Sequence, residues 1–173
     1  MNAPISRPQL SRVDILGVRV AAIDLPKALD TIESWIAAGK HHYVCITGAH
    51  GVMESRRDPV LRAIHNKAGM ATPDGMPLVW VSRLLGHADT KRVYGPDLMR
   101  ALSALSAKRG YRQFYYGGDK GVADQLAAVL KRDCPGLVVA GTLCPPFRPL
   151  TSEEDDDVVA RSMRPSPTSS GSG

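Results

Sequence analysis

The sequence predicts an α/β protein with a mostly parallel sheet that is covered by helices on both faces. Short apolar, β-branched runs alternate along the chain with longer amphipathic runs, in which apolar residues recur every three or four positions. The loops between them carry the glycine, proline and aspartate residues that end strands and begin helices. This alternation is typical of βαβ units, and a length of 173 residues suits one core.

The elements of the first half follow from local signals. Residues 13–20 (VDILGVRV) are apolar and β-branched, which predicts a strand or the start of a hairpin. A helix follows, with Asp24 placed as its N-cap, Pro26 in its first turn and Gly39 at its end. HYVCIT (42–47) predicts a short strand.

Three more helices are expected before the middle of the chain. One follows the GAHG segment and extends to Arg57, and a second has Asp58 as its cap and Pro59 in its first turn. GMAT leads into a Pro-Asp-Gly turn, and the apolar run MPLVWVSRLLG after it is long enough, with Gly86 at its end, to favour a helix over a buried strand.

The second half repeats the alternation. The expected elements are a helix from Pro96 to Gly110, a strand ending at YY, a glycine-rich loop, a helix that stops at Pro135, the strand LVVAGT and a last helix from Thr151 or Ser152. The carboxylates of residues 153–157 then lie at the positive end of that last helix, where they are more simply a solvated face than a metal site.

Three loops are expected at the carboxyl ends of strands, where parallel sheets bind ligands: ITGAHG, ATPDG and YYGGDKG. In each, a structural interpretation competes with a functional one. Asp74 is either the polar residue of a tight turn or a general base, and Arg92 is either a surface residue or a phosphate contact. Gly117 and Gly118 either form a strand-to-helix turn or approach a phosphate.

Composition limits the classes of partner. The net charge of +5 suits an anion, but the 5% aromatic content argues against nucleic acid as that partner. The G-G-x-x-G spacing is not the dinucleotide fingerprint, which disfavours an oxidoreductase. The histidines lack the spacing of metal ligands, and the cysteines lack a C-x-x-C pair, so we expect no metal and reduced thiols. No apolar run could span a bilayer or serve as a signal peptide, so we expect a cytoplasmic protein.

Read together, "VCITGAHGVMESRRDPVLRAIHNKAGMATPDGMPLVWVSRLLG", "RVYGPDLM", "YYGGDKGVADQL" and "GTLCPPFRPLTSEE" resemble the WecG/TagA/CpsF family of bacterial glycosyltransferases. The resemblance implies a Rossmann-like fold and inverting transfer of N-acetylmannosamine, its uronic acid or a hexose from a UDP donor. It implies a polyprenyl-diphosphate-linked sugar as acceptor, at the inner face of the cytoplasmic membrane, in exopolysaccharide or other cell-surface polysaccharide synthesis. It also implies no metal or other cofactor, and a homo-oligomer is possible.

The resemblance assigns roles residue by residue. The aspartate of the P-D-G motif is Asp74, the expected catalytic base, and the arginine of R-V-x-G-x-D is Arg92, an expected phosphate or transition-state contact. The threonine of a T-x-N motif is Thr47, although Ala49 stands where the family has asparagine. The other expected substrate contacts are Asp97, Gly117 and Gly118, together with His50 in a strand-end loop and Arg148 in the P-F-R-P segment.

The ends of the chain are expected to differ from its middle. We expect a flexible N-terminus over residues 1–12, the transferase domain over 13–161 and a disordered tail over 162–173. Read one nucleotide earlier, codons for the tail could encode an apolar strand of the family, so the tail is predicted to be a frameshift product. The fold would then be incomplete at its C-terminus and its activity impaired, and the alternative is a non-catalytic nucleotide-binding fragment.

Overall fold

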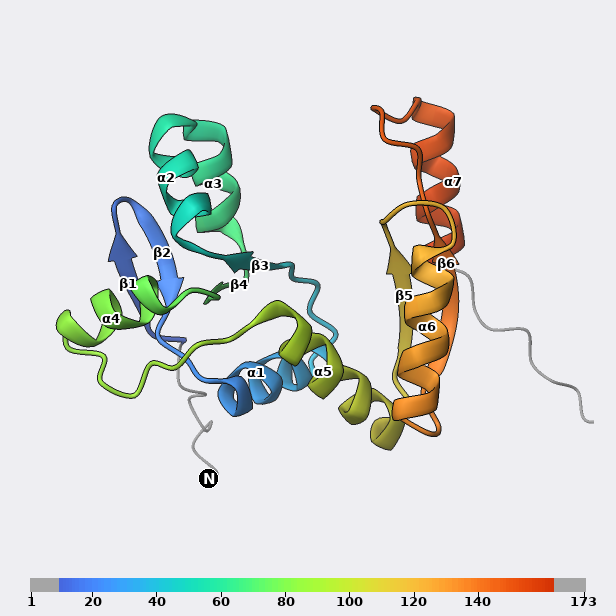
Figure 1. Cartoon of the computed structure of the whole chain (residues 1–173), viewed down its shortest axis with the longest axis horizontal. Coiled ribbons are helices and arrows are strands. Elements are labelled where there is room, and N and C mark those ends of the chain that lie inside the picture. The colour runs from blue at the N-terminus through green and yellow to red at the C-terminus, as the bar shows by residue number, and fades with distance from the viewer. Residues whose placement is uncertain (1–9, 164–173) are drawn as a thin grey trace, which may run out of the picture. The chain divides into compact units, whose positions relative to one another are not determined.

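The computed structural model describes residues 10–163, and the chain divides into two compact units, Met1–Met99 and Arg100–Gly173. Figure 1 shows its elements, which are β1 (Arg12–Ile15), β2 (Val18–Ala21), α1 (Leu25–Ala37), β3 (Val44–Thr47), α2 (Ala49–Arg57), α3 (Pro59–Lys67), β4 (Met70–Pro73), α4 (Met76–Leu84), α5 (Gly95–Arg109), β5 (Arg112–Tyr116), α6 (Val122–Asp133), β6 (Val138–Leu143) and α7 (Ser152–Met163). The α/β class predicted from the alternation is confirmed.

The described strands pair as three two-stranded sheets rather than as one continuous sheet. β3 pairs with β4 and β5 pairs with β6, both in parallel, whereas β1 and β2 are antiparallel. Each parallel pair is joined through helices, as a parallel connection requires. The predicted parallel pairing is therefore present within each unit, on short strands.

The antiparallel pair confirms the hairpin interpretation of residues 13–20. Its strands are joined by Leu16 and Gly17 alone, with φ angles of 53° and 89°. Positive φ at both central residues matches the right-handed twist of the two strands. The main-chain N–H of Gly17 donates to the Asp14 carboxylate over 2.8 Å, which holds the turn.

Two predicted N-caps are confirmed. The Asp24 carboxylate accepts from the N–H of Lys27 at the start of α1, over 3.1 Å. The Asp58 carboxylate accepts from the N–H groups of Val60 and Leu61 at the start of α3, over 2.8 and 3.1 Å. Both aspartates satisfy N–H groups that a helix leaves without partners.

β4 is the strand expected before the ATPDG loop, but sequence patterns did not give its bounds, because its four residues, MATP, include a proline and lead directly into that loop. All four residues are buried. Pro73 is tolerated because it stands last in the strand, where its carbonyl accepts from the N–H of Val93 over 2.9 Å. Since Thr47 pairs with Pro73, β3 and β4 end side by side.

Each unit has its own apolar core. The first unit buries the hairpin against α2 and α4, and a second cluster packs Ile23 and Met70 with residues of α1 and α5. The second unit packs α6 on β5, with Tyr115 and Leu130 in the cluster. These cores hold the ends of the parallel strands in place.

The predicted ends of the domain lie mostly outside the described residues, which exclude 1–9 and 164–173. Within the described part, Arg12 already belongs to β1. α7 extends to Met163, so the first two residues of the predicted tail are helical. It begins at Ser152, as the sequence predicted, and its N-terminus is a capping box, because Thr151 and Glu154 exchange hydrogen bonds.

Candidate active site

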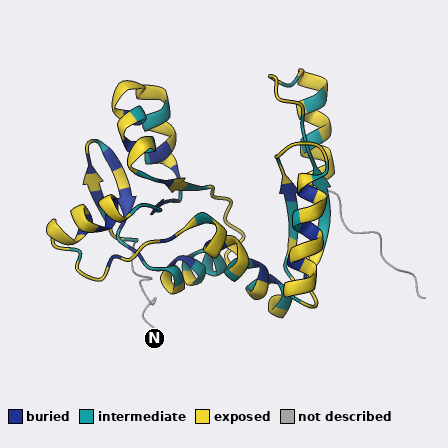
Figure 2. Cartoon of the chain, in the orientation of Figure 1, coloured by how far each residue is buried: buried dark blue, intermediate teal, exposed yellow. Residues whose placement is uncertain are grey.

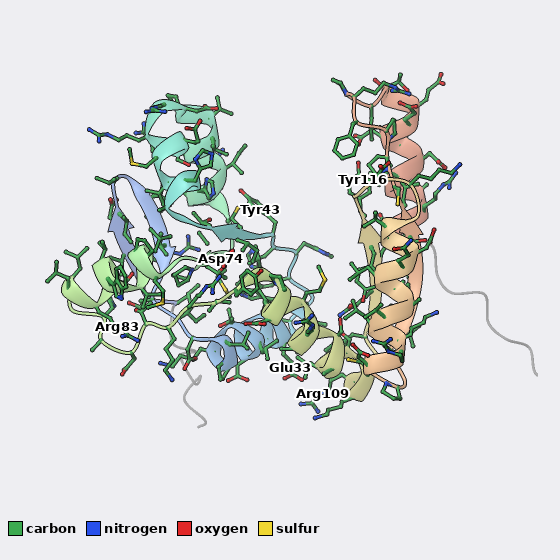
Figure 3. All side chains as sticks on the ribbon, viewed as in Figure 1. Glu33, Tyr43, Asp74, Arg83, Arg109 and Tyr116 are labelled. Carbon is green, nitrogen blue, oxygen red and sulfur yellow. The ribbon has the colours of Figure 1, made fainter. Side chains whose placement is uncertain are left out.

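Asp74 and Thr47 meet at the carboxyl ends of β4 and β3. The N–H of Asp74 donates to the carbonyl of Thr47 over 2.9 Å. The next residue, Gly75, neighbours the other loop, because a Cβ built there would make ordinary contact with the Ala49 nitrogen at 3.9 Å. Figure 3 shows Asp74 where the β-strands of the first unit end. This is the edge at which parallel sheets bind ligands.

Arg92 joins this edge although it is eighteen residues from Asp74 in the chain. Its Nε donates to the Asp74 carbonyl over 2.6 Å, and its Nη2 lies 3.4 Å from the Asp74 carboxylate. Its guanidinium also lies over the Tyr94 ring, 4.3 Å from the centroid. The two predicted catalytic residues are therefore in contact, with one edge of the guanidinium bonded to Asp74 and its face on the Tyr94 ring.

The Asp74 carboxylate is not the capping group of a tight turn. Pro73 ends a strand, and Gly75 is extended, with φ −114° and ψ 145°, as the N-cap residue of α4. Among the described residues, the partner of the carboxylate is Arg92, and the side chain is 25% exposed. A carboxylate in this setting is partly shielded from water and open to a substrate, as a general base must be.

Thr47 presents an unpaired hydroxyl beside this pair. The residue is 1% exposed, and its Oγ1 is buried without a hydrogen-bond partner among the described residues. A buried hydroxyl without a partner costs free energy, so such atoms are rare and need an explanation. A ligand that accepts from or donates to this hydroxyl would remove the cost.

His50 and Asp97 lie in helix first turns of the first unit. His50 is exposed in the first turn of α2, directly after the Thr47 loop. Asp97 is exposed in the first turn of α5, where its charge complements the helix dipole. Neither makes a hydrogen bond or ion pair with Asp74 or Arg92.

The glycine-rich loop belongs to the second unit. Gly117 and Gly118 have φ angles of 117° and 79°, which suit glycine. The N–H of Gly117 donates to the Leu143 carbonyl over 2.9 Å, and the N–H of Lys120 donates to the Asp119 carboxylate over 2.7 Å. The N–H groups of Gly117 and Lys120 are thus used inside the protein, and the contact of Gly118 with a substrate stays a prediction.

Arg148 is bound to Glu154. Its Nη1 and Nη2 donate to the two carboxylate oxygens over 2.7 and 2.6 Å. These hydrogen bonds, with one from the Thr151 N–H, lower the pKa of Glu154 to about 2, and they raise the pKa of Arg148. A bidentate pair of this kind is a strong, directional contact. In this structure the guanidinium therefore orients the start of α7.

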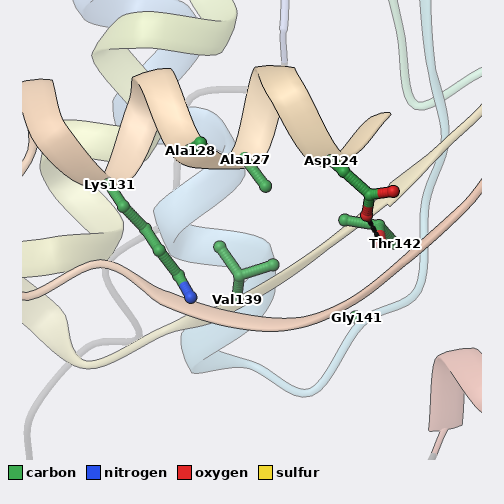
Figure 4. Close-up of a pocket in the computed structure, with 7 residues that line it drawn as sticks. All are labelled: Asp124, Ala127, Ala128, Lys131, Val139, Gly141 and Thr142. Carbon is green, nitrogen blue, oxygen red and sulfur yellow. Dashed lines mark hydrogen bonds between the residues drawn. The ribbon is translucent and has the colours of Figure 1, made fainter. Parts of the chain in front are cut away.

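Sequence reasoning missed one member of the site. Tyr94 lies against the Arg92 guanidinium. The signal for Tyr94 was the alternation R-V-Y, in which Val93 is buried and the residues beside it are exposed. A shallow hollow between α6 and β6 contains none of the predicted site residues; Figure 4 shows it lined by Asp124, Ala127, Ala128, Lys131, Val139, Gly141 and Thr142.

Residues 10–163 contain no group of three or more His, Cys, Asp or Glu side chains that could hold a metal ion. Within the same residues, no helix has both the length and the apolar character needed to cross a lipid bilayer.

Comparison with known proteins gives consistent matches. The model of the family described as "Glycosyl transferase WecG/TagA/CpsF family" matches residues 13–168. An N-acetylglucosaminyldiphosphoundecaprenol N-acetyl-beta-D-mannosaminyltransferase of Bacillus spizizenii is 34% identical over 88 residues, which cover 51% of this chain and 34% of that protein. The protein of the same name from Bacillus subtilis is 30% identical over 69 residues, covering 40% and 27%. The matched segments thus span about a third of these relatives.

Proposed function

This chain belongs to the WecG/TagA/CpsF family of glycosyl transferases, and from that premise we propose that it acts in transfer of N-acetylmannosamine from a UDP donor to a lipid-diphosphate-linked sugar. The choice of sugar and acceptor follows the names of the two Bacillus relatives. Of the sugars that the sequence left open, N-acetylmannosamine is therefore the one we propose. The lipid of such an acceptor lies in a membrane, so the reaction is placed at a membrane surface, in the assembly of a cell-surface polysaccharide.

Asp74 is the general base of the proposed reaction. The acceptor hydroxyl attacks the anomeric carbon and loses its proton to the Asp74 carboxylate, while the bond from that carbon to the diphosphate oxygen breaks. Attack opposite the leaving group inverts the configuration. The carboxylate is suitable because its direction is set by main-chain hydrogen bonds on both sides of Asp74.

Arg92 and Thr47 are assigned to the donor. The leaving UDP gains negative charge as the bond breaks, and a positioned cation stabilises that charge. The Nη1 of Arg92 makes no hydrogen bond among residues 10–163, whereas Nε and Nη2 face Asp74, so one edge of the guanidinium can meet a phosphate oxygen. The Thr47 hydroxyl is buried at the same strand end, so it would gain its missing partner from the donor if binding opens the loop that covers it. The proposal requires no resident cofactor.

The observation that carries the proposal is the contact between Asp74 and Arg92 at the end of the β3–β4 pair. A base and a cation at one strand-end edge are what a reaction needs when a hydroxyl loses a proton and a diphosphate departs. Neither residue is needed there for the strand pairing itself, which uses main-chain groups. The proposed role of the two side chains is thus separable from the fold.

The test compares Asp74→Asn with the control Asp133→Asn. Asp133 is a surface residue whose carboxylate pairs with Arg132. Transfer is measured from labelled UDP-N-acetylmannosamine to N-acetylglucosaminyl diphosphate on a short lipid, and UDP affinity is measured by calorimetry. Asp74→Asn should lower transfer by about 10²–10⁴-fold, as expected for a lost general base, with UDP affinity unchanged. Asp133→Asn should change neither quantity.

Other outcomes decide between the alternatives. UDP binding without transfer by the unmodified chain would support the non-catalytic nucleotide-binding alternative. If the unmodified chain neither bound UDP nor transferred the sugar, the proposal would be refuted for this chain. Saturable binding of a nicotinamide dinucleotide instead of UDP would favour the oxidoreductase that the loop spacing disfavours.

A further inference from the structure

α4 has an exposed apolar surface, which we call the α4 stripe: Met76, Trp80, Val81, Leu84 and Leu85. Leu84 is 86% exposed and Trp80 is 61% exposed. Figure 2 shows most of α4 coloured as exposed. Apolar side chains this open, gathered on one helix, mark an interaction surface rather than ordinary scatter.

The α4 stripe is a helix face and not a frayed end. Met76, Trp80 and Leu84 follow one another at intervals of four, so their side chains share one face. Val81 and the C-cap residue Leu85 extend this exposed apolar surface around the helix. The opposite face consists of Leu78, Val79 and Ser82, all buried in the first unit. The helix therefore packs on its own unit with one apolar face and presents a second one outward.

The α4 stripe is continuous with the proposed site. α4 begins at Met76, and its N-cap Gly75 directly follows Asp74. One turn of helix rises about 5.4 Å, so Trp80 lies about one turn from the start of α4. A surface on which the α4 stripe rested would therefore lie near the Asp74 carboxylate.

The borders of the stripe carry cations. Arg83 is exposed on α4, where Figure 3 labels it, and its Nε donates to the Thr90 carbonyl over 2.9 Å. The connection after α4 is thus held beside the helix. The residue after Thr90, Lys91, has a side chain that is 67% exposed, and its Nζ lies 3.6 Å from the Asp24 carboxylate, a long surface pair of little strength that a lipid phosphate can replace. Exposed tryptophan and leucine with flanking lysine and arginine are typical of helices that lie in the interface of an anionic bilayer.

We propose that the α4 stripe docks on the surface of an anionic lipid bilayer and so brings Asp74 to a lipid-linked acceptor. The inference rests on the proposed function, which places the acceptor in a membrane. Trp80 and Leu84 enter the boundary between head groups and acyl chains, and Arg83 and Lys91 meet lipid phosphates. A second copy of the chain fits less well, because each copy has a net charge of +5 and would bring like charges together, whereas an anionic bilayer complements them.

The binding test uses the full chain and vesicles that contain neither donor nor acceptor. Trp35→Phe leaves Trp80 as the single tryptophan. With vesicles of phosphatidylcholine and phosphatidylglycerol, we expect its emission to shift to the blue and to be quenched by brominated acyl chains. We expect about tenfold weaker binding to pure phosphatidylcholine, since each cation near an anionic surface contributes about 1 kcal/mol. Equal affinity for the two vesicles, or no quenching, would overturn the proposal.

The variant test is the double change Trp80→Ser with Leu84→Ser. Both side chains are exposed, so circular dichroism should be unchanged, and flotation with the anionic vesicles should fall at least tenfold. The matched control is Val60→Ser with Ile64→Ser, an exposed apolar pair with the same spacing on α3. The control should float like the original chain. Equal loss in both variants would overturn the assignment to α4.

Two measurements keep this inference separate from the proposed function. The Trp80 and Leu84 variant should retain UDP affinity and transfer to a short-lipid acceptor in solution, and lose transfer to an acceptor in vesicles. Normal transfer in vesicles would refute the docking role while leaving the proposed function intact. Sedimentation that shows a dimer of the original chain and a monomer of the variant would make the stripe a protein interface and overturn the proposal.

Discussion

Thr47→Val removes the buried hydroxyl that has no partner and keeps the shape of the side chain. Thr47 is 1% exposed, so its Oγ1 has lost water without gaining a hydrogen bond. Leaving a buried polar group unsatisfied costs about 1–3 kcal/mol. Valine carries no such cost, so the free energy of unfolding of the ligand-free first unit should rise by about 1 kcal/mol or more.

Urea unfolding followed by tryptophan fluorescence measures this change selectively, because Trp35 and Trp80 both lie in the unit Met1–Met99. With a slope of about 1–3 kcal/mol per molar urea, a gain of 1 kcal/mol raises the midpoint by roughly 0.3–1 M. UDP affinity should fall about tenfold in the same variant, the value of one hydrogen bond of about 1.4 kcal/mol. A more stable protein that binds its donor less well would be the signature of a hydroxyl kept for a ligand.

Thr90→Val is the matched control, since Thr90 is also 1% exposed with an unpaired Oγ1. It should stabilise the first unit to a similar extent and leave UDP affinity unchanged. If Thr47→Val instead lowered the midpoint, the hydroxyl would already have a partner, and the reasoning would be wrong. An unchanged UDP affinity in Thr47→Val would separate the hydroxyl from the donor.

Three further changes test local contacts. The pKa of Glu154 is lowered from 4.5 to about 2, chiefly by Arg148, so its contribution to α7 is complete above pH 4.5 and is lost as the pH falls through 2; Arg148→Gln should raise the midpoint of the Glu154 carboxyl titration in NMR. Gly118→Ala places a Cβ 2.8 Å from the Val122 side chain, whereas the Cβ of Gly121→Ala meets no atom within 4 Å. Gly118→Ala should therefore lower the free energy of opening of α6, measured by hydrogen exchange, by about 1 kcal/mol more than Gly121→Ala does. Asp58→Ala removes two hydrogen bonds at the start of α3 and should cost about 1 kcal/mol in the urea experiment.

Each of these expectations has a contrary result. An unchanged Glu154 midpoint in Arg148→Gln would mean that the carboxyl is held by the Thr151 N–H rather than by the guanidinium. Equal exchange in the two alanine variants would show that positive φ, and not the contact with Val122, limits the loop. A full loss of the fluorescence transition in Asp58→Ala would mean that the cap holds more than one helix.

Local chemistry made much of the fold predictable. The caps at Asp24 and Asp58 depend on neighbours within three residues, so the sequence contains all that they need. The hairpin and most helices follow similarly from patterns within single segments. The bounds of β4 could not be predicted, because its burial comes from the rest of the first unit and four residues that include proline show no period of their own.

The candidate site divides in the same way. The residue types and the strand-end positions of Asp74, Arg92 and Thr47 could be predicted from motifs. Their mutual contact could not, because it depends on the register of β3 with β4 and on the segment at Arg92 and Val93, which returns beside the end of β4. The hydrogen bonds of Gly117 and the pairing of Arg148 were likewise invisible in the sequence.

What the sequence by itself determined is the set of local structures and the kinds of chemical groups placed at the ends of strands, because caps, turns and periodic patterns act over a few residues. Only the tertiary structure decided which of those groups meet. It paired Asp74 with Arg92, left the Thr47 hydroxyl without a partner and turned the α4 stripe outward. The reason is that contacts between distant segments are set by how buried strands and helices pack, and a pattern within one segment does not specify which other segment it will meet.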